Sequence, residues 1–355
     1  FMTGKEAKRL ASLDAMRGLA VLGMLPFHLV FFGGFFALGS GGGTNVFTAL
    51  PFPIEFRPPL GTGLILFFFV TGVSLAASIS RKKSFIEIGR RTIIRYGAYY
   101  LVSILFEIIL WSVIGWRLDI SFILSGYFSF FQPIEGLSIA AVLAFPLIFL
   151  FNWKKLLVIS SGLALAVGIA LYAVFLPQAS SLPVYSPLNP LLIGLFSALK
   201  GLPMELFGAS IGKLVLEGKD IKKKMILIGI AIVTVYVVVP FLLGSGMLHM
   251  LLMVWSYPSA ILFTLGSSLF LFGLFQFVEA RKISLSPLKV LGRLSFFVYF
   301  GHWMILLPSI QILGGVGVIS KNLGLLLVLM VISLTVAWVL TYFYGRWRWG
   351  SPSTW

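Results

Sequence analysis

The sequence contains no cysteine, only three histidines and few charged residues, which are 11% of its 355 positions. Without cysteine, disulfides, thiol chemistry and thiolate metal sites are excluded. The three histidines are scattered and lack the spacing of metal ligands, so we expect no metal cofactor. Hydrophobic residues make up 59% of the chain. Because a soluble domain of this length could not bury so much apolar surface, the composition predicts an integral membrane protein.

Ten apolar stretches have about the 20 residues that a membrane-spanning helix needs. They predict an all-α fold, a polytopic transmembrane helix bundle that forms one domain over residues 1–355. The expected spans lie near residues 16–37, 60–80, 92–114, 134–152, 156–176, 190–212, 225–243, 251–278, 294–312 and 324–345.

The basic residues set the expected orientation. The net charge of +16 would suggest a nucleic-acid partner in a soluble protein, but here the charges cluster between apolar stretches. If the N-terminus is cytoplasmic, all but four of the 27 Lys and Arg residues fall on the cytoplasmic side. The exceptions are Arg57, Arg117, Lys200 and Lys321. By the positive-inside rule both termini are cytoplasmic, membrane lipids surround the bundle, and no nucleic acid is expected as a partner.

Two histidines lie inside expected spans at matching depths. His28 follows Arg17 by eleven residues, and His302 follows Arg293 by nine. At a rise of about 1.5 Å per residue these separations are roughly 16 and 14 Å, so both imidazoles are expected near the middle of the membrane. A neutral imidazole there can accept or donate a proton. The alternative is that each histidine only hydrogen-bonds a neighbouring group.

Three acidic or hydroxyl side chains accompany them. Asp14 and Arg17 are spaced i,i+3 and therefore share a helix face, where they form either a functional pair or a surface ion pair. Ser12 is a candidate N-cap of that helix. Glu107 lies in the middle of the third expected span and could pair with a histidine or an arginine.

These residues carry a resemblance to a known family. Residues 12–20 read Ser-Leu-Asp-Ala-Met-Arg-Gly-Leu-Ala, which resembles the first helix of the membrane acyltransferases related to heparan-α-glucosaminide N-acetyltransferase. Residues 294–302 end in Val-Tyr-Phe-Gly-His and resemble the Val-Tyr-x-Gly-His signature of that family's penultimate helix. Weaker likenesses lie at residues 69–74 and 131–136. The resemblance therefore spans nearly the whole chain.

The resemblance implies an acetyl-CoA-dependent N-acetyltransferase. Acetyl-CoA would serve as the co-substrate from the cytoplasm, and the acceptor would be the amine of an amino sugar, such as a terminal glucosamine, or another glycan on the outer side. Relatives suggest a homodimer. The short N-terminus and the lack of a large outer domain lead us to expect a microbial plasma membrane.

Roles for single residues follow from the resemblance and from phosphate chemistry. The family's proposed catalytic histidine lies in the outer loop after the first helix, but loop 38–59 has no histidine here, so we place the base at His28. His302 would orient the thioester, with Asp14 and Glu107 as further catalytic candidates. Asn45 and Glu55 would hold the acceptor. Arginine and lysine bind phosphate well, although the positive-inside rule alone would also place them on the cytoplasmic side. The candidates for CoA binding are Arg17, Arg91, Arg95, Lys289 and Arg293.

Two other functions stay open at this stage. The acyltransferase-three family, which O-acylates surface polysaccharides, has a similar start motif, Leu-Asp-x-Leu-Arg-Gly. A secondary transporter of an organic anion would also suit ten helices interrupted by Gly and Pro, although the sequence shows no inverted repeat.

Overall fold

The computed structural model describes residues 11–24, 62–80, 84–115, 133–178, 188–243 and 245–301, with short pieces between 328 and 344. All regular secondary structure in these residues is helical, and they contain no strand. The prediction of an all-α fold is therefore confirmed for the part of the chain that is described. The number of membrane spans and the cytoplasmic location of both termini stay predictions.

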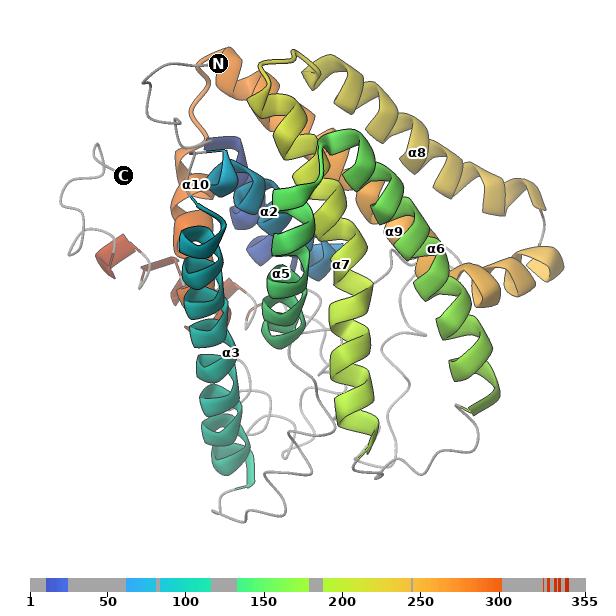
Figure 1. Cartoon of the computed structure of the whole chain (residues 1–355), viewed down its shortest axis with the longest axis horizontal. Helices are drawn as coiled ribbons and strands as arrows, with labels where there is room; N and C mark the ends of the chain where they lie inside the picture. Colours follow the sequence, from blue (N-terminus) through green and yellow to red (C-terminus); the bar gives the residue numbers. More distant parts are fainter. Residues whose placement is uncertain are drawn as a thin grey trace. The chain divides into compact units, whose positions relative to one another are not determined.

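The helices follow one another along the chain as shown in Figure 1. They are α2 (Thr62–Ile79), α3 (Phe85–Gly115), α5 (Pro133–Leu150), α6 (Trp153–Gln178), α7 (Leu188–Leu216), α8 (Lys222–Leu243), α9 (Ser245–Ala280) and α10 (Ser286–Arg293). Residues 11–24 and 295–301 are also helical.

Seven expected spans, from the second at 60–80 to the eighth at 251–278, each fall on one of these helices. Several helices extend beyond the apolar stretch that predicted them. α3, for example, begins at Phe85 rather than near residue 92. The first, ninth and tenth spans lie partly outside the described residues.

The chain forms two compact units. The first lies within Leu64–Phe277 and holds most of α2 to α9. The second combines described parts of Ala11–Gly63 and Val278–Trp355, and therefore brings together segments from opposite ends of the sequence.

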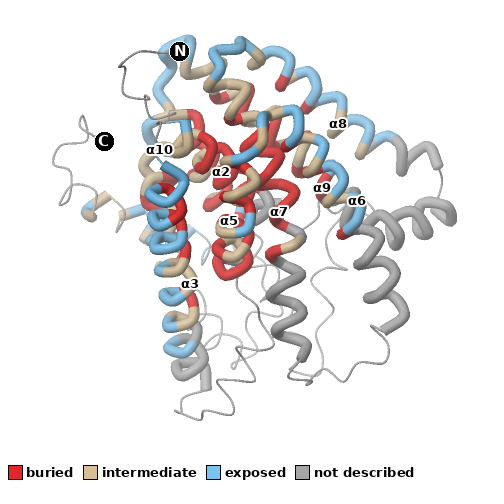
Figure 2. Tube along the Cα trace, in the orientation of Figure 1, coloured by how far each residue is buried: buried red, intermediate tan, exposed pale blue. Residues whose placement is uncertain are grey.

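In the first unit, α7 packs against both α5 and α6, and α3 packs against α5. The buried residues concentrate on α2, α5 and α7 (Figure 2). Glycines let α2 and α7 touch backbone to backbone. A Cβ atom on Gly72 would lie 1.8 Å from the Glu205 carbonyl oxygen, and one on Gly208 would lie 2.1 Å from the Phe69 carbonyl oxygen. Such small-residue contacts are typical of helix pairs in membranes, where close approach replaces the hydrophobic effect as the driving force.

Large aliphatic side chains lie exposed along the helices of this unit. Examples are Ile94 and Leu101 on α3, Val158 on α6 and Leu227 on α8. Soluble proteins rarely expose so much apolar surface, whereas lipid would cover it. By length and composition, the segment Ile261–Ala280 qualifies among the described residues as able to cross a membrane, and Leu66–Ile79 and Ile134–Leu150 are shorter apolar helices.

Candidate functional site

A buried carboxylate in the second unit joins the two ends of the sequence. Asp14 lies on the helix of residues 11–24, and its Oδ1 accepts a hydrogen bond from Arg17 Nη1 at 3.1 Å. Its Oδ2 accepts from Arg293 Nε of α10 at 3.4 Å. The Asp14 side chain is 2% exposed, whereas those of Arg17 and Arg293 are 28% and 21% exposed. The predicted i,i+3 pair is therefore confirmed, and both guanidinium groups are partly exposed.

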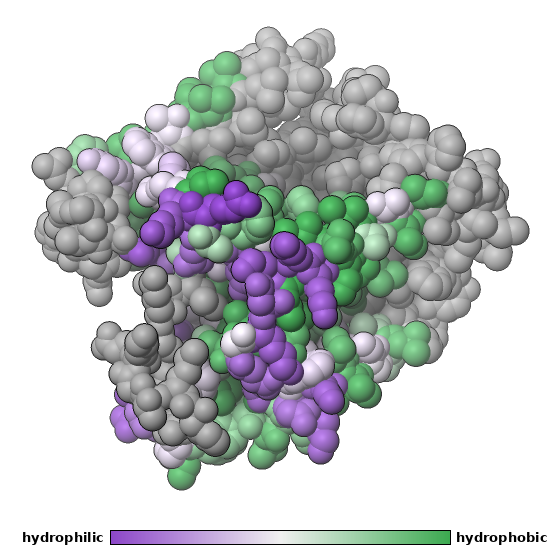
Figure 3. Space-filling view, turned by 90° about the horizontal axis from the view of Figure 1, so that it is seen from above, coloured by the Kyte–Doolittle hydropathy of each residue, from purple (hydrophilic) through white to green (hydrophobic). Residues whose placement is uncertain are grey.

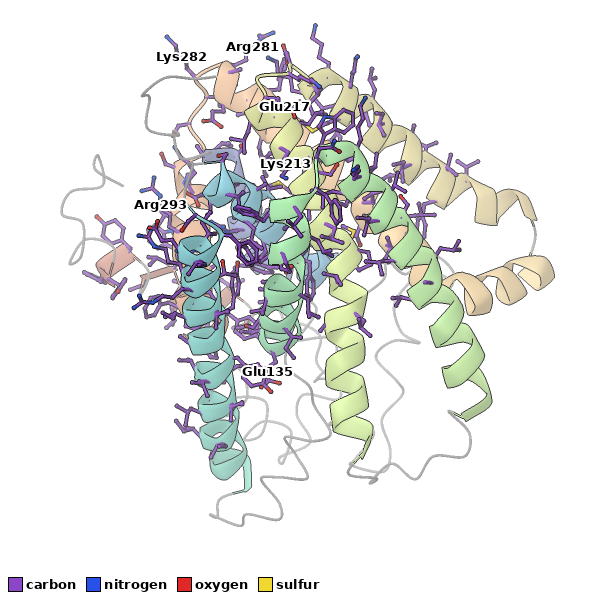
Figure 4. The ribbon with its side chains drawn as sticks, viewed as in Figure 1. Glu135, Lys213, Glu217, Arg281, Lys282 and Arg293 are labelled. Carbon is purple, nitrogen blue, oxygen red and sulfur yellow. The ribbon has the colours of Figure 1, made fainter. Side chains whose placement is uncertain are left out.

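Two glycines make this arrangement sterically feasible. A Cβ atom on Gly292 would lie 1.6 Å from the carbonyl oxygen of Asp14, and one on Gly18 would lie 2.1 Å from that of Leu288. The helix of residues 11–24 and α10 therefore touch backbone to backbone, which side chains at these positions would prevent. This contact places Arg293 next to Asp14, and Figure 4 labels Arg293 at the end of α10.

A second acidic residue supports the start of the same helix. The backbone N–H of Ser12 donates to Glu279 Oε2 at 3.2 Å. A carboxylate at this position satisfies one of the free N–H groups of the first turn and complements the helix dipole. The hydroxyl of Ser12 is buried and has no hydrogen-bond partner among the described residues. The prediction that the Ser12 side chain caps this helix was therefore wrong, because Glu279 binds the helix start instead.

A basic pocket lies between α2 and α3 in the first unit. Its volume is about 120 Å³. Since one water needs on the order of 10–15 Å³, the pocket admits a group of several heavy atoms. Its lining residues are Leu75 and Ser78 from α2 and Ile88, Arg91, Thr92, Arg95 and Tyr96 from α3. On α3 they recur every three or four residues, so they share one helix face.

This pocket brings together two of the predicted phosphate-binding arginines. Arg91 Nη2 lies 2.8 Å from Glu87 Oε1, but both side chains are largely exposed, at 63% and 45%. Arg95 forms no ion pair with a carboxylate in the described part of the chain. Two guanidinium groups beside the hydroxyls of Thr92 and Tyr96 form a site that favours an anion, phosphate above all.

Sequence reasoning identified both pocket arginines but missed the hydroxyl-bearing residues Ser78, Thr92 and Tyr96. Thr92 and Tyr96 are spaced i,i+4 and each directly follows one of the arginines Arg91 and Arg95. This repeat was the signal that could have located both hydroxyl-bearing residues of α3. Glu279 was also missed, although it is an acidic residue at the end of an expected span, beside a basic loop.

The remaining predicted site residues are less well placed. Lys289 lies half-buried on α10, the helix that carries Arg293. Glu107 is on α3, but the structure does not describe its side chain. His28, His302, Asn45 and Glu55 fall outside the described residues, so their roles stay predictions. Within the described residues, no three His, Asp or Glu side chains are grouped so that they could hold a metal ion.

Comparison with known proteins identifies the class of this protein. Residues 10–342 match a family model described as an acyltransferase domain, and this range includes both the Asp14 cluster and the α2–α3 pocket. Because the match covers nearly the whole chain, the protein belongs to the acyltransferase-three family, whose members are generally membrane proteins. No curated protein matches the chain. The family is thus the alternative that the start motif left open, and the match does not support the family related to heparan-α-glucosaminide N-acetyltransferase.

Proposed function

We propose that this acyltransferase moves an acyl group, acetyl in the simplest case, from acyl-CoA on the cytoplasmic side of a microbial membrane to a hydroxyl of a surface glycan. The family match supports acyl transfer. The observation that supports a CoA donor is the α2–α3 pocket, in which Arg91 and Arg95 lie beside the hydroxyls of Thr92 and Tyr96.

The donor carries phosphate groups, which need paired cations and hydroxyl donors. In this proposal Arg91 and Arg95 bind one phosphate of the donor. The CoA-binding roles of Arg17, Lys289 and Arg293 stay predictions from the sequence. Asp14 then acts as a positioning residue rather than a catalytic one. Its buried carboxylate binds two guanidinium groups that are themselves partly exposed.

In the proposed reaction the histidines carry out proton transfer and stabilise charge. The acceptor hydroxyl attacks the thioester carbonyl carbon, a C–O bond forms and the C–S bond breaks. His28 takes the hydroxyl proton, and CoA leaves as a thiolate that then gains a proton. His302 steadies the developing oxyanion, and Asn45 and Glu55 hold the acceptor. A homodimer would be the working assembly.

Donor binding tests the pocket directly. In purified protein we expect Arg95→Gln to weaken acetyl-CoA binding roughly 10-fold or more, because a hydrogen bond to a charged group is lost. Arg90 is the matched control, since it is exposed on the same helix next to Arg91 but does not line the pocket. Arg90→Gln should leave the dissociation constant unchanged. Equal weakening in both variants would show that general positive charge, not the pocket, binds the donor.

Acceptor chemistry is tested with labelled acetyl-CoA and two sugars, one with hydroxyls only and one with a free amine. An alkali-labile ester product supports the proposal, and an alkali-stable amide would show the N-acetyltransferase activity that the first-helix resemblance implied. His28→Ala should abolish transfer but spare acetyl-CoA binding. Saturable anion flux in liposomes without CoA turnover would contradict both readings and indicate a transporter.

A further inference from the structure

A second basic surface lies in the first unit and is made of residues other than those of the donor pocket. It consists of Trp153, Lys154 and Lys155 at the start of α6 and Lys219 after α7, and we call it the Trp153 platform. The Nζ atoms of Lys154 and Lys219 lie 5.6 and 5.0 Å from the centroid of the Trp153 ring. Both distances are within the range of cation–π attraction, so one aromatic ring gathers ammonium groups from two helix ends.

Hydrogen bonds fix this surface in place. Ser210 Oγ of α7 donates to the Trp153 carbonyl oxygen at 2.9 Å. Lys213 Nζ donates to the carbonyl oxygens of Ile148 and Phe151 at the end of α5. The last turns of α7 are therefore bonded to the end of α5 and the start of α6. Figure 4 labels Lys213 and Glu217 at this end of α7.

Lys213 serves to bond α7 to the end of α5. Desolvation by burial lowers the pKa of its ammonium group from the ordinary lysine value, and the Glu217 carboxylate opposes that shift. Because its Nζ already donates to two carbonyl oxygens, Lys213 is not among the cations that the platform offers to a ligand.

The platform carries positive charge that its own acidic neighbours do not neutralise. Glu217 pairs with Lys219 at 3.1 Å, and Asp220 pairs with Lys222 at 3.0 Å. Lys154 and Lys155 are exposed and form no ion pair with any described carboxylate. Lys223 and Lys224 at the start of α8 have none either. These unpaired lysines therefore favour binding of an anionic ligand.

Exposed aliphatic side chains lie within four residues of these lysines along the chain. They are Leu150 at the end of α5, Val158 on α6 and Leu227 on α8. Figure 3 shows hydrophilic residues gathered beside hydrophobic ones on the face seen from above. A ligand that matches both parts has an anionic head and apolar tails.

We infer that the Trp153 platform binds an anionic phospholipid of the cytoplasmic leaflet, with its phosphate at the exposed lysines of the platform and its acyl chains along the exposed aliphatic residues. Tryptophan is enriched at the membrane interface, and clustered lysines next to a spanning helix attract anionic headgroups. A free nucleotide would match the cations but not the apolar surface. This inference depends on the membrane location and not on the proposed reaction.

Lipid titration of the full-length protein in neutral detergent tests the inference. We expect dioleoylphosphatidylglycerol to raise the melting temperature in a saturable way and dioleoylphosphatidylcholine to have little effect. Each lysine near anionic lipid contributes about 1 kcal/mol, or about 5-fold in affinity. Lys154→Gln should therefore weaken phosphatidylglycerol binding about 5-fold, and Lys154→Gln with Lys155→Gln about 25-fold.

Lys282→Gln is the matched control, because Lys282 is also an exposed lysine but lies in the second unit. It should leave lipid affinity unchanged, and all variants should melt like the wild type before lipid is added. Equal binding of both lipids, or equal weakening by Lys282→Gln, would overturn the inference. Displacement of the lipid by acetyl-CoA would do so as well, because the platform would then belong to the donor site.

Discussion

In the second unit the carboxylate of Asp14 is 2% exposed and lies between two guanidinium groups, whereas in the first unit that of Glu87 is 45% exposed and pairs with Arg91. The groups are chemically alike but their surroundings differ. A buried carboxylate that loses its charge leaves its partners uncompensated, while an exposed ion pair contributes about 0–1 kcal/mol because water and salt screen it. The Asp14 cluster therefore holds structure together, and the α2–α3 pocket leaves its arginines available to a ligand.

The largest expected effect comes from the glycine contact beneath Asp14. Gly292→Ala would place a Cβ atom 1.6 Å from the Asp14 carbonyl oxygen, so the two helices would have to separate. We expect a loss of roughly 3 kcal/mol or more in stability, since overpacking against rigid backbone cannot relax. The readout is the melting temperature and the yield of monodisperse protein.

Gly23→Ala is the control on the helix of residues 11–24, because a Cβ atom there meets nothing within 4 Å. It should be neutral or stabilise by about 0.5–1 kcal/mol, as alanine favours a helix more than glycine does. If Gly292→Ala behaves like Gly23→Ala, the two helices do not approach each other as described.

The next largest effect is expected at Asp14, the buried one of the two carboxylates compared above. Asp14→Asn should cost roughly 2–4 kcal/mol of stability, less than a wholly buried pair would, because Arg17 and Arg293 keep part of their hydration. It should also weaken acetyl-CoA binding, since both guanidinium groups lose the partner that orients them. Isothermal titration and thermal unfolding measure the two effects. Unchanged affinity in a folded Asp14→Asn protein would remove the positioning role.

The smallest effect is expected at the exposed pair. Glu87→Gln should change stability by no more than about 0.5 kcal/mol. It should tighten acetyl-CoA binding about 2-fold, because the negative charge of Glu87 no longer offsets the positive charge of Arg91. Binding at two ionic strengths checks this expectation. A destabilisation as large as that of Asp14→Asn would mean that the two sites do not differ in the way their exposure indicates.

Local features of the sequence were predictable because they depend on neighbours along one helix. The apolar stretches located seven helices, and the i,i+3 spacing located the Asp14–Arg17 pair. The start of α3 was placed too late, because its first turns are basic and amphipathic and the span criterion counts only apolar residues.

Contacts between distant segments could not be predicted in this way. Arg293 joins Asp14 across a sequence separation of 279 residues, and no periodicity reports such a contact. α10 was missed because its eight residues are too few and too polar to span a membrane. Gly18 and Gly292 permit close contact between the helix of residues 11–24 and α10. That role can be recognised only once the two helices are known to touch. The roles of His28 and His302 remain predictions.

The hydrogen bonds of Asp14 also bear on how the protein is made. Arg293 is synthesised 279 residues after Asp14. At about 5–20 residues per second, that interval lasts on the order of 15–60 s. During this time the hydrogen bonds from Arg293 to Asp14 and from Ser12 to Glu279 cannot form. The second unit is therefore completed only after Arg293 is made, and a ribosome that stalls before Arg293 releases a chain without this contact.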